Sequence, residues 1–193
     1  MVYIRELEEY AKVNRIPIML KDGIEFLCNY IGKNNIKNVL EIGSAIGYSA
    51  IMMCLNNKNL KVTTIEKDIK MFNEALKNIN KFNMNGRITI INSDALAVDI
   101  KDKYDLIFID AAKSQYIKFF EKFEVNLNNN GIIITDNLSF HGLVENPNLT
   151  SNRNTKQLVK KIQKYIDYLK TNDKYNTKFY LIGDGISISK KKN

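Results

Sequence analysis

The sequence has no tryptophan, two prolines, two cysteines and a single histidine among its 193 residues. No apolar run approaches the roughly 18 residues that a membrane-spanning helix needs, and the first residues, MVYIRELEEY, lack the apolar core of a secretion signal. Cys28 and Cys54 lie in apolar helical patterns without metal or redox spacing, so we expect core thiols. These absences predict a cytoplasmic protein that has no membrane partner.

Composition and length indicate a globular chain. Hydrophobic residues make up 45% and charged residues 26% of the sequence, values that are ordinary for soluble globular proteins and unlike those of disordered chains. The length falls within the usual range for one domain, so we expect residues 1–193 to form a single domain.

The positive charge leaves the partner open. A formal net charge of +8 makes an anionic partner such as nucleic acid worth considering. Lysine, asparagine and isoleucine are abundant throughout while arginine is scarce, a bias typical of AT-rich coding, and part of the surplus lies in the C-terminal KKKN. Such a run is more often solvated than functional, so charge alone does not decide the matter.

Short apolar segments alternate with amphipathic stretches of helical length. The apolar segments are rich in valine and isoleucine and apolar through their centres, as strands buried on both faces must be; they occupy 37–42, 60–66, 87–92, 104–110 and 131–136. The amphipathic stretches occupy 48–57, 69–82 and 115–127. This alternation predicts an α/β fold, a Rossmann-like parallel sheet with helices on both faces.

Further elements are expected at the two ends of the chain. Two helices, at about 3–13 and 20–32, precede the first strand. After the fifth strand, a polar loop leads to a long helix at 153–171, and the segment 178–190 reads as two strands around a Gly-Asp-Gly turn. This C-terminal segment predicts an antiparallel hairpin. Its two strands, added to the five apolar strands, give a seven-stranded, mostly parallel sheet.

A glycine-containing turn follows the first expected strand in EIGSAIGYS. Gly43 and Gly47 allow a sharp turn and the close approach of a ligand. Glu66 stands 23 residues after Gly43, at the end of the second strand, where an acid in such folds binds the two ribose hydroxyls. Since the pattern is E-x-G-x-x-x-G and not the dinucleotide form G-x-G-x-x-G, we expect a nucleoside ligand without phosphates.

Four motifs in order, EIGSAIGYS, IEKD, DAAKSQY and TDN, give the sequence a family resemblance. It resembles the cation-dependent O-methyltransferases that use S-adenosylmethionine (SAM), the catechol O-methyltransferase-like family, from residue 16 through residue 189. The resemblance implies a class I methyltransferase fold, a homodimer, and N-terminal helices in residues 1–35 that cap the site.

The resemblance also implies which residues bind the cofactor. Gly43, Ala45 and Ser49 would line the methionine part of SAM, Glu66 would hold the ribose, and Asp94 with Ala95 would border the adenine; Asp110 is expected to face the cofactor as well. Asp94 is also a candidate N-cap of a helix, and both roles can hold together.

Polar side chains end the fourth and fifth expected strands. Asp110 ends the fourth and Asp136 with Asn137 ends the fifth, on the edge where doubly wound sheets bind ligands. Two carboxylates and an amide oxygen suit a hard cation such as Mg²⁺, and the resemblance implies the same three ligands. The alternatives are that Asp136 and Asn137 form a turn and that Asp110 caps a helix.

Lys113 follows Asp110 by one turn. Burial and a nearby dication favour the uncharged form of an amine, which can accept a proton from a hydroxyl. The resemblance implies that the lysine of D-x-x-K is the catalytic base. A surface lysine at a helix start is the alternative, although cations are disfavoured there.

The acceptor substrate is less determined. Animal catechol methyltransferases carry a glutamate in a DGLE-type segment, whereas this segment reads DGIS, with Ser187 in the place of the acid. NRIPIM at 14–19 and RNTKQLVKKI at 153–162 resemble the bacterial branch that methylates 5-hydroxyuridine at the tRNA wobble position. The O5 and O4 atoms of 5-hydroxyuracil form a two-oxygen chelate like that of a catechol, so one metal site can serve either acceptor.

A basic helix and a histidine complete the candidate acceptor site. Arg153, Lys156, Lys160 and Lys161 fall at helical spacing and are suited to phosphate contacts, although a solvated helix face is the ordinary reading of such a run. His141, in the loop after Asn137, is a candidate substrate contact or is incidental. We therefore expect a SAM- and Mg²⁺-dependent O-methyltransferase that acts on tRNA or on a small phenol. A nucleotide- or RNA-binding domain without catalysis is the alternative from another class.

Overall fold

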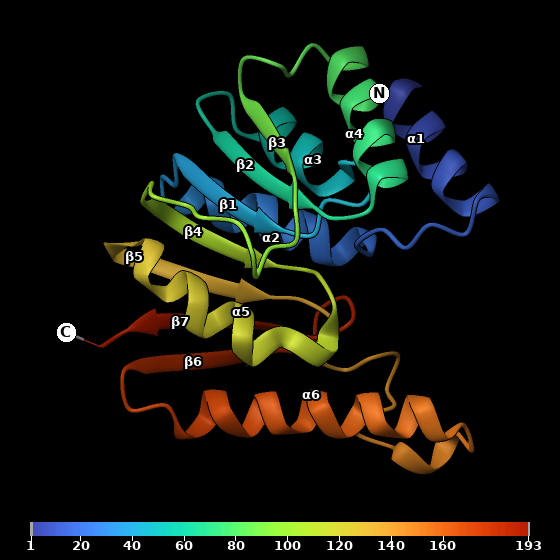
Figure 1. The fold of residues 1–193 in the computed structure, drawn as a ribbon, viewed down its shortest axis with the longest axis vertical. Helices are drawn as coiled ribbons and strands as arrows, with labels where there is room; N and C mark the ends of the chain where they lie inside the picture. The colour runs from blue at the N-terminus through green and yellow to red at the C-terminus, as the bar shows by residue number, and fades with distance from the viewer. Residues whose placement is uncertain (1, 193) are drawn as a thin grey trace.

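The computed structural model describes residues 2–192, in which seven strands form one sheet (Figure 1). The strands are β1 Asn38–Ile42, β2 Lys61–Glu66, β3 Ile88–Asn92, β4 Tyr104–Ile109, β5 Leu127–Thr135, β6 Tyr175–Tyr180 and β7 Ile186–Lys191. The α-helices are α1 Val2–Val13, α2 Lys21–Lys33, α3 Tyr48–Asn56, α4 Ile69–Lys81, α5 Tyr116–Phe123 and α6 Arg153–Thr171. Short 3₁₀ turns are η1 Lys113–Gln115, η2 Glu124–Asn126 and η3 Pro147–Leu149.

The strand order is β3-β2-β1-β4-β5-β7-β6. Strands β1 to β5 are parallel, and β7 pairs antiparallel with both β5 and β6. The predicted mostly parallel α/β sheet with a C-terminal antiparallel hairpin is therefore confirmed. The fifth strand begins at Leu127, four residues before the expected 131, because Tyr104 of β4 pairs with it across an irregularity in register.

Two apolar cores, one on each face of the sheet, explain why the central strands are apolar throughout. Val39 of β1 packs with side chains from α1 to α4, whereas the next residue, Leu40, packs with side chains from α5 and α6. Leu106 and Ile107 of β4 divide between the two faces in the same way. In Figure 1, α1 lies beside α4, and α6 runs along β6.

The chain reverses its direction across the sheet between β1 and β4, the place where doubly wound folds bind ligands. The carboxyl ends of β1, β2, β4 and β5 meet at this edge. Within residues 2–192, no helix combines the length and the apolar character that a membrane crossing requires.

Candidate active site

A cavity of about 740 Å³ opens at this edge of the sheet. Its lining includes all seven residues expected at the cofactor: Gly43, Ala45, Ser49, Glu66, Asp94, Ala95 and Asp110. Lys113, Asn137 and His141 also line it, and Pro17 to Leu20, between α1 and α2, form another part of its wall. Asp136 is not among the lining residues and is only 1% exposed.

The turn after β1 brings its backbone against β4. Gly43 has φ +94°, and a Cβ at this position would lie 2.3 Å from the carbonyl oxygen of Asp110, so no other residue fits without moving the backbone. Gly47, with φ +82°, precedes α3. Gly43 therefore lets two backbone segments lie close together, while the close approach of a ligand to the glycines stays a prediction.

Backbone amides fix the carboxylate of Glu66. Ala45 N–H donates to Oε2 at 2.9 Å and Asp68 N–H donates to Oε1 at 2.8 Å. Asp68 in turn begins α4, where its Oδ1 accepts from Lys70 N–H and Met71 N–H. Each oxygen of Glu66 keeps a lone pair, so the carboxylate is able to accept hydrogen bonds from a pair of vicinal hydroxyls.

Ser49 is oriented by a fully buried acid. Its Oγ donates to Glu41 Oε1 at 2.5 Å, and Thr64 Oγ1 donates to Oε2 at 2.6 Å. Burial raises the pKa of Glu41 to about 7, with the two hydroxyl hydrogen bonds acting against that rise and the charges of Asp110 and Glu66 adding to it. Because the Ser49 proton is directed at Glu41, its lone pairs remain free to accept from a ligand donor.

Asp94 begins a tight turn, and the alternative that it caps a helix is wrong. Its Oδ1 accepts from Leu96 N–H at 2.8 Å, and its carbonyl accepts from Ala97 and Val98 N–H. Residues 93–103 contain no helix, because the chain crosses directly from β3 to β4. Ala95 is 8% exposed and forms an apolar part of the cavity wall.

The structure brings the three expected metal ligands together at the ends of β4 and β5. Burial and, after it, the charge of Asp110 raise the pKa of Asp136 to about 7. Burial likewise raises the pKa of Asp110, while the neighbouring Lys113 lowers it and Asp184 raises it. A bound cation would reduce the repulsion between neighbouring ionised carboxylates.

One oxygen of this group lacks a partner. Asp136 Oδ1 is buried and has no hydrogen bond within residues 2–192. Leaving a buried acceptor unsatisfied costs about 1–3 kcal/mol, a cost that coordination to a cation would remove. The donor set, two carboxylates and one amide, therefore fits a hard divalent cation. No three His, Cys, Asp or Glu side chains in the described residues gather as metal ligands, so such a site depends on the amide of Asn137.

Lys113 reaches across to Asn137. Its Nζ donates to Asn137 Oδ1 at 2.8 Å and lies 5.8 Å from the centre of the Phe140 ring. The side chain is half-buried at the cavity wall and does not extend into solvent. The alternative that Asp110 caps the following helical turn is wrong, since η1 begins after Ala112 and has no side-chain cap.

The remaining candidates differ in their access to the cavity. Ser187 is fully buried within β7, opposite Thr135 of β5, and is absent from the cavity lining. The side chain of His141 is 73% exposed at the cavity, with Nδ1 3.7 Å from Asp184 Oδ1. The four basic candidates on α6 are exposed, and none forms an ion pair with another described residue: Arg153, Lys156, Lys160 and Lys161.

Comparison with known proteins identifies the family. A model of the O-methyltransferase family matches residues 1–192. The chain belongs to the O-methyltransferase family. A family member from Staphylococcus aureus, provisionally named a caffeoyl-CoA O-methyltransferase, has a crystal structure that superposes with a TM-score of 0.92 at 39% identity, covering 98% of this chain and 92% of that one. An O-methyltransferase from Bacillus cereus, solved with S-adenosylhomocysteine, shares the fold at 22% identity, with a TM-score of 0.83 and coverage of 100% and 91%.

Curated relatives match over shorter stretches. The caffeoyl-CoA O-methyltransferase of Populus kitakamiensis is 30% identical over 154 residues, which are 73% of this chain and 65% of the relative. The catechol O-methyltransferase of Niastella koreensis is 33% identical over 122 residues, 59% of this chain and 55% of the relative. The matched stretches thus span less than two thirds of the length of these relatives.

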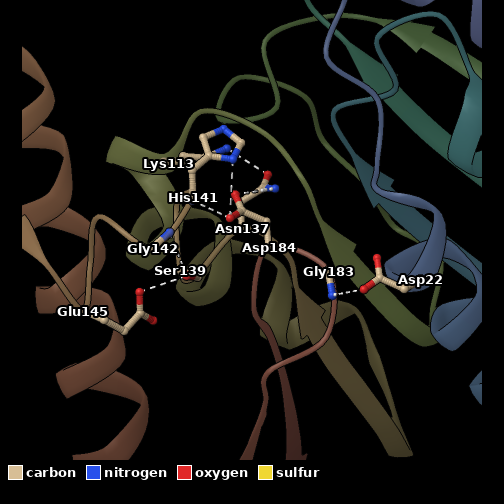
Figure 2. Close-up of polar contacts among 9 residues, drawn as sticks. All are labelled: Asp22, Lys113, Asn137, Ser139, His141, Gly142, Glu145, Gly183 and Asp184. Carbon is tan, nitrogen blue, oxygen red and sulfur yellow. Dashed lines mark hydrogen bonds and ion pairs between the residues drawn. The ribbon is translucent and has the colours of Figure 1, made fainter. Parts of the chain in front are cut away.

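One further polar residue of the site, Asp184, has no signal of its role in the sequence. Asp184 is 5% exposed, lines the cavity, and accepts hydrogen bonds from Asn137 and from the backbone of His141 (Figure 2). The sequence shows it only as the centre of a Gly-Asp-Gly turn. Its partners are more than 40 residues away in the chain, so no local pattern could indicate them.

Proposed function

We propose that this protein is a SAM-dependent O-methyltransferase whose acceptor carries two adjacent oxygens. The observation that carries the proposal is the partnerless buried oxygen of Asp136, next to the Lys113–Asn137 pair at the wall of a cavity that the family's glycine turn also lines. Glu66 would accept from the ribose hydroxyls of SAM, and Ser49 from a donor in its methionine part.

Asp110, Asp136 and Asn137 would hold a divalent cation, for which Mg²⁺ is the proposed species. When bound, the cation would supply Lewis acidity toward the acceptor hydroxyl. Lys113, in its uncharged form, would take the hydroxyl proton. The acceptor oxygen then bonds to the methyl carbon as the bond between that carbon and sulfur breaks, leaving S-adenosylhomocysteine and the methyl ether.

For the acceptor we propose 5-hydroxyuridine at the tRNA wobble position, converted to 5-methoxyuridine. Support comes from α6, which supplies both a cavity residue, Leu158, and the row of exposed basic side chains. A nucleotide bound in the cavity would thus leave its flanking phosphates next to free cationic groups. The resemblance of 14–19 and 153–162 to the tRNA-modifying branch agrees with this proposal.

A small phenol is the second candidate. It is favoured by the names of the curated relatives, one of which is a catechol O-methyltransferase. Against a catechol-specific site stands Ser187, which is not acidic and is buried away from the cavity.

The test is an acceptor screen with methyl-labelled SAM and Mg²⁺. Bulk tRNA from a strain that lacks the gene is compared with catechol and caffeoyl-CoA. We expect label in tRNA, as 5-methoxyuridine by mass spectrometry, and unmodified 5-hydroxyuridine in the knockout strain. Label only in the phenols, or unchanged 5-methoxyuridine in the knockout, would reject the tRNA acceptor. Cofactor binding without label in any acceptor would favour a domain that has lost catalysis.

A further inference from the structure

We propose that Asp184 is a positioning residue, which turns the amide of Asn137 so that its oxygen faces Lys113 and the site of the cation. This inference rests on the proposed function, because it assigns a task within the same site. Asp184 comes from the turn between β6 and β7, far in sequence from the strand ends that carry the other polar groups.

The hydrogen bonds around Asn137 have a fixed polarity. Its Nδ2 donates to Asp184 Oδ2 at 3.3 Å, and its Oδ1 accepts from Lys113 Nζ at 2.8 Å (Figure 2). A carboxylate only accepts and an ammonium only donates, so the two neighbours together allow one orientation of the amide. When the lysine is uncharged or moves toward substrate, Asp184 alone still enforces that orientation.

Asp184 is distinguished from the expected ligands by the state of its oxygens. Its Oδ1 accepts from His141 N–H and its Oδ2 from Asn137, so both are engaged. Asp136 Oδ1, in contrast, is buried and has no hydrogen-bond partner among the described residues. The oxygen that is free to bind a cation thus belongs to Asp136, a proposed metal ligand. The oxygens of Asp184 are already hydrogen-bonded, and Asp184 orients Asn137, as residues behind metal ligands commonly do.

The same turn holds the loop that follows Asn137. Ser139 N–H donates to the carbonyl of Asp184 at 2.8 Å, and Leu138 N–H donates to that of Gly185 at 2.9 Å. Asn137, Phe140 and His141 all have positive φ, between 50° and 61°, a conformation that side chains disfavour. Contacts to the β6–β7 turn therefore offset a strained loop, and Asp184 contributes through its backbone and through both carboxylate oxygens.

The test reverses the hydrogen bond. In Asp184→Asn, the new amide keeps its oxygen toward His141 N–H and points its NH₂ group at that of Asn137, so Asn137 flips and turns a donor toward the cation. The double variant Asn137→Asp/Asp184→Asn restores the bond with its direction inverted and keeps the net charge. Glu145→Gln is the matched control, because Glu145 accepts from Ser139 Oγ in the same loop and does not contact Asn137.

The readout is Mn²⁺ affinity of the full chain by titration calorimetry, with S-adenosylhomocysteine binding and the melting temperature measured alongside. We expect Asp184→Asn to weaken Mn²⁺ binding about 10- to 100-fold, with S-adenosylhomocysteine binding unchanged. The double variant should recover most of the affinity, and Glu145→Gln should match the wild type. Loss of fold in Asp184→Asn with recovery of both fold and affinity in the double variant would also support the pairing.

Two results would overturn the inference. Mn²⁺ binding by Asp184→Asn at the wild-type affinity would show that the orientation of Asn137 does not depend on Asp184. A double variant that binds no better than Asp184→Asn would show that the carboxylate acts in some way other than this hydrogen bond. Failure of the wild type itself to bind Mn²⁺ is a distinct outcome, which would reject the proposed cation site together with this role.

Discussion

The two halves of the cavity differ in how far their carboxylates are satisfied. On the side of β1 and β2, Glu66 accepts from two backbone amides and Glu41 accepts from two hydroxyls. On the side of β4 and β5, Asp136 has a buried oxygen with no partner within residues 2–192, and the charges of Asp110 and Asp184 act on it. The first half is preformed for a neutral or cationic ligand, whereas the second half has an excess of negative charge that a cation would offset.

Removal of divalent cations should have the largest effect, because it should affect the half of the cavity at β4 and β5 and not the half at β1 and β2. EDTA should abolish methyl transfer and added Mg²⁺ should restore it, because in the proposed site the cation aligns the acceptor. S-adenosylhomocysteine binding should persist in EDTA, since Glu66 and Glu41 in the other half already accept hydrogen bonds from the protein itself. A methyl-transfer assay and binding calorimetry, each with and without EDTA, check the two parts, and full activity in EDTA would contradict the proposed site.

Lys113→Ala should lower turnover by about 10²- to 10⁴-fold, the usual contribution of a proton-transfer group. Its Nζ lies at the cavity wall on the acceptor side, so cofactor affinity should remain at the wild-type level. Steady-state kinetics combined with cofactor titration separates the two effects. A variant with undiminished turnover would remove Lys113 from the role of base.

The double variant Lys156→Ala/Lys160→Ala tests whether the basic side chains of α6 bind the phosphates of tRNA. Each lost phosphate contact should reduce the salt dependence of tRNA binding by about one in the slope of log K against log salt. Methylation of a small phenol should not change, because these side chains are exposed and are absent from the cavity lining. Equal losses with both acceptors would point to an effect on folding.

Glu41→Gln should give the smallest effect, a change in how stability depends on pH. The pKa of Glu41 is about 7 in the folded chain against 4.5 as its ordinary value, so the folded state binds more protons between these two values. The free energy of unfolding therefore falls as pH rises from about 4.5 to about 7, and this contribution is constant above. In denaturation experiments between pH 4.5 and 7, the free energy of unfolding should fall less steeply for the variant than for the wild type. Identical pH profiles would contradict the raised pKa of Glu41.

The fold followed from local patterns, but the site did so only in part. Alternating apolar and amphipathic segments predicted the sheet, and ligand-type residues at strand ends were expected at one edge because parallel strands end together. Asp184 was missed because its importance arises from contacts with Asn137 and His141 across the sheet edge. The helix considered after Asp94 was absent because the turn there is followed directly by a crossing of the sheet.

The contact between Gly43 and the carbonyl of Asp110 has a consequence for how such a site can vary. The missing side chain lets the turn after β1, where the proposed methyl donor would lie, pack against Asp110 of the proposed cation site, so a single added methyl group would force the two apart. Alanine at this position should thus lengthen the path of the transferred carbon even if both ligands still bind.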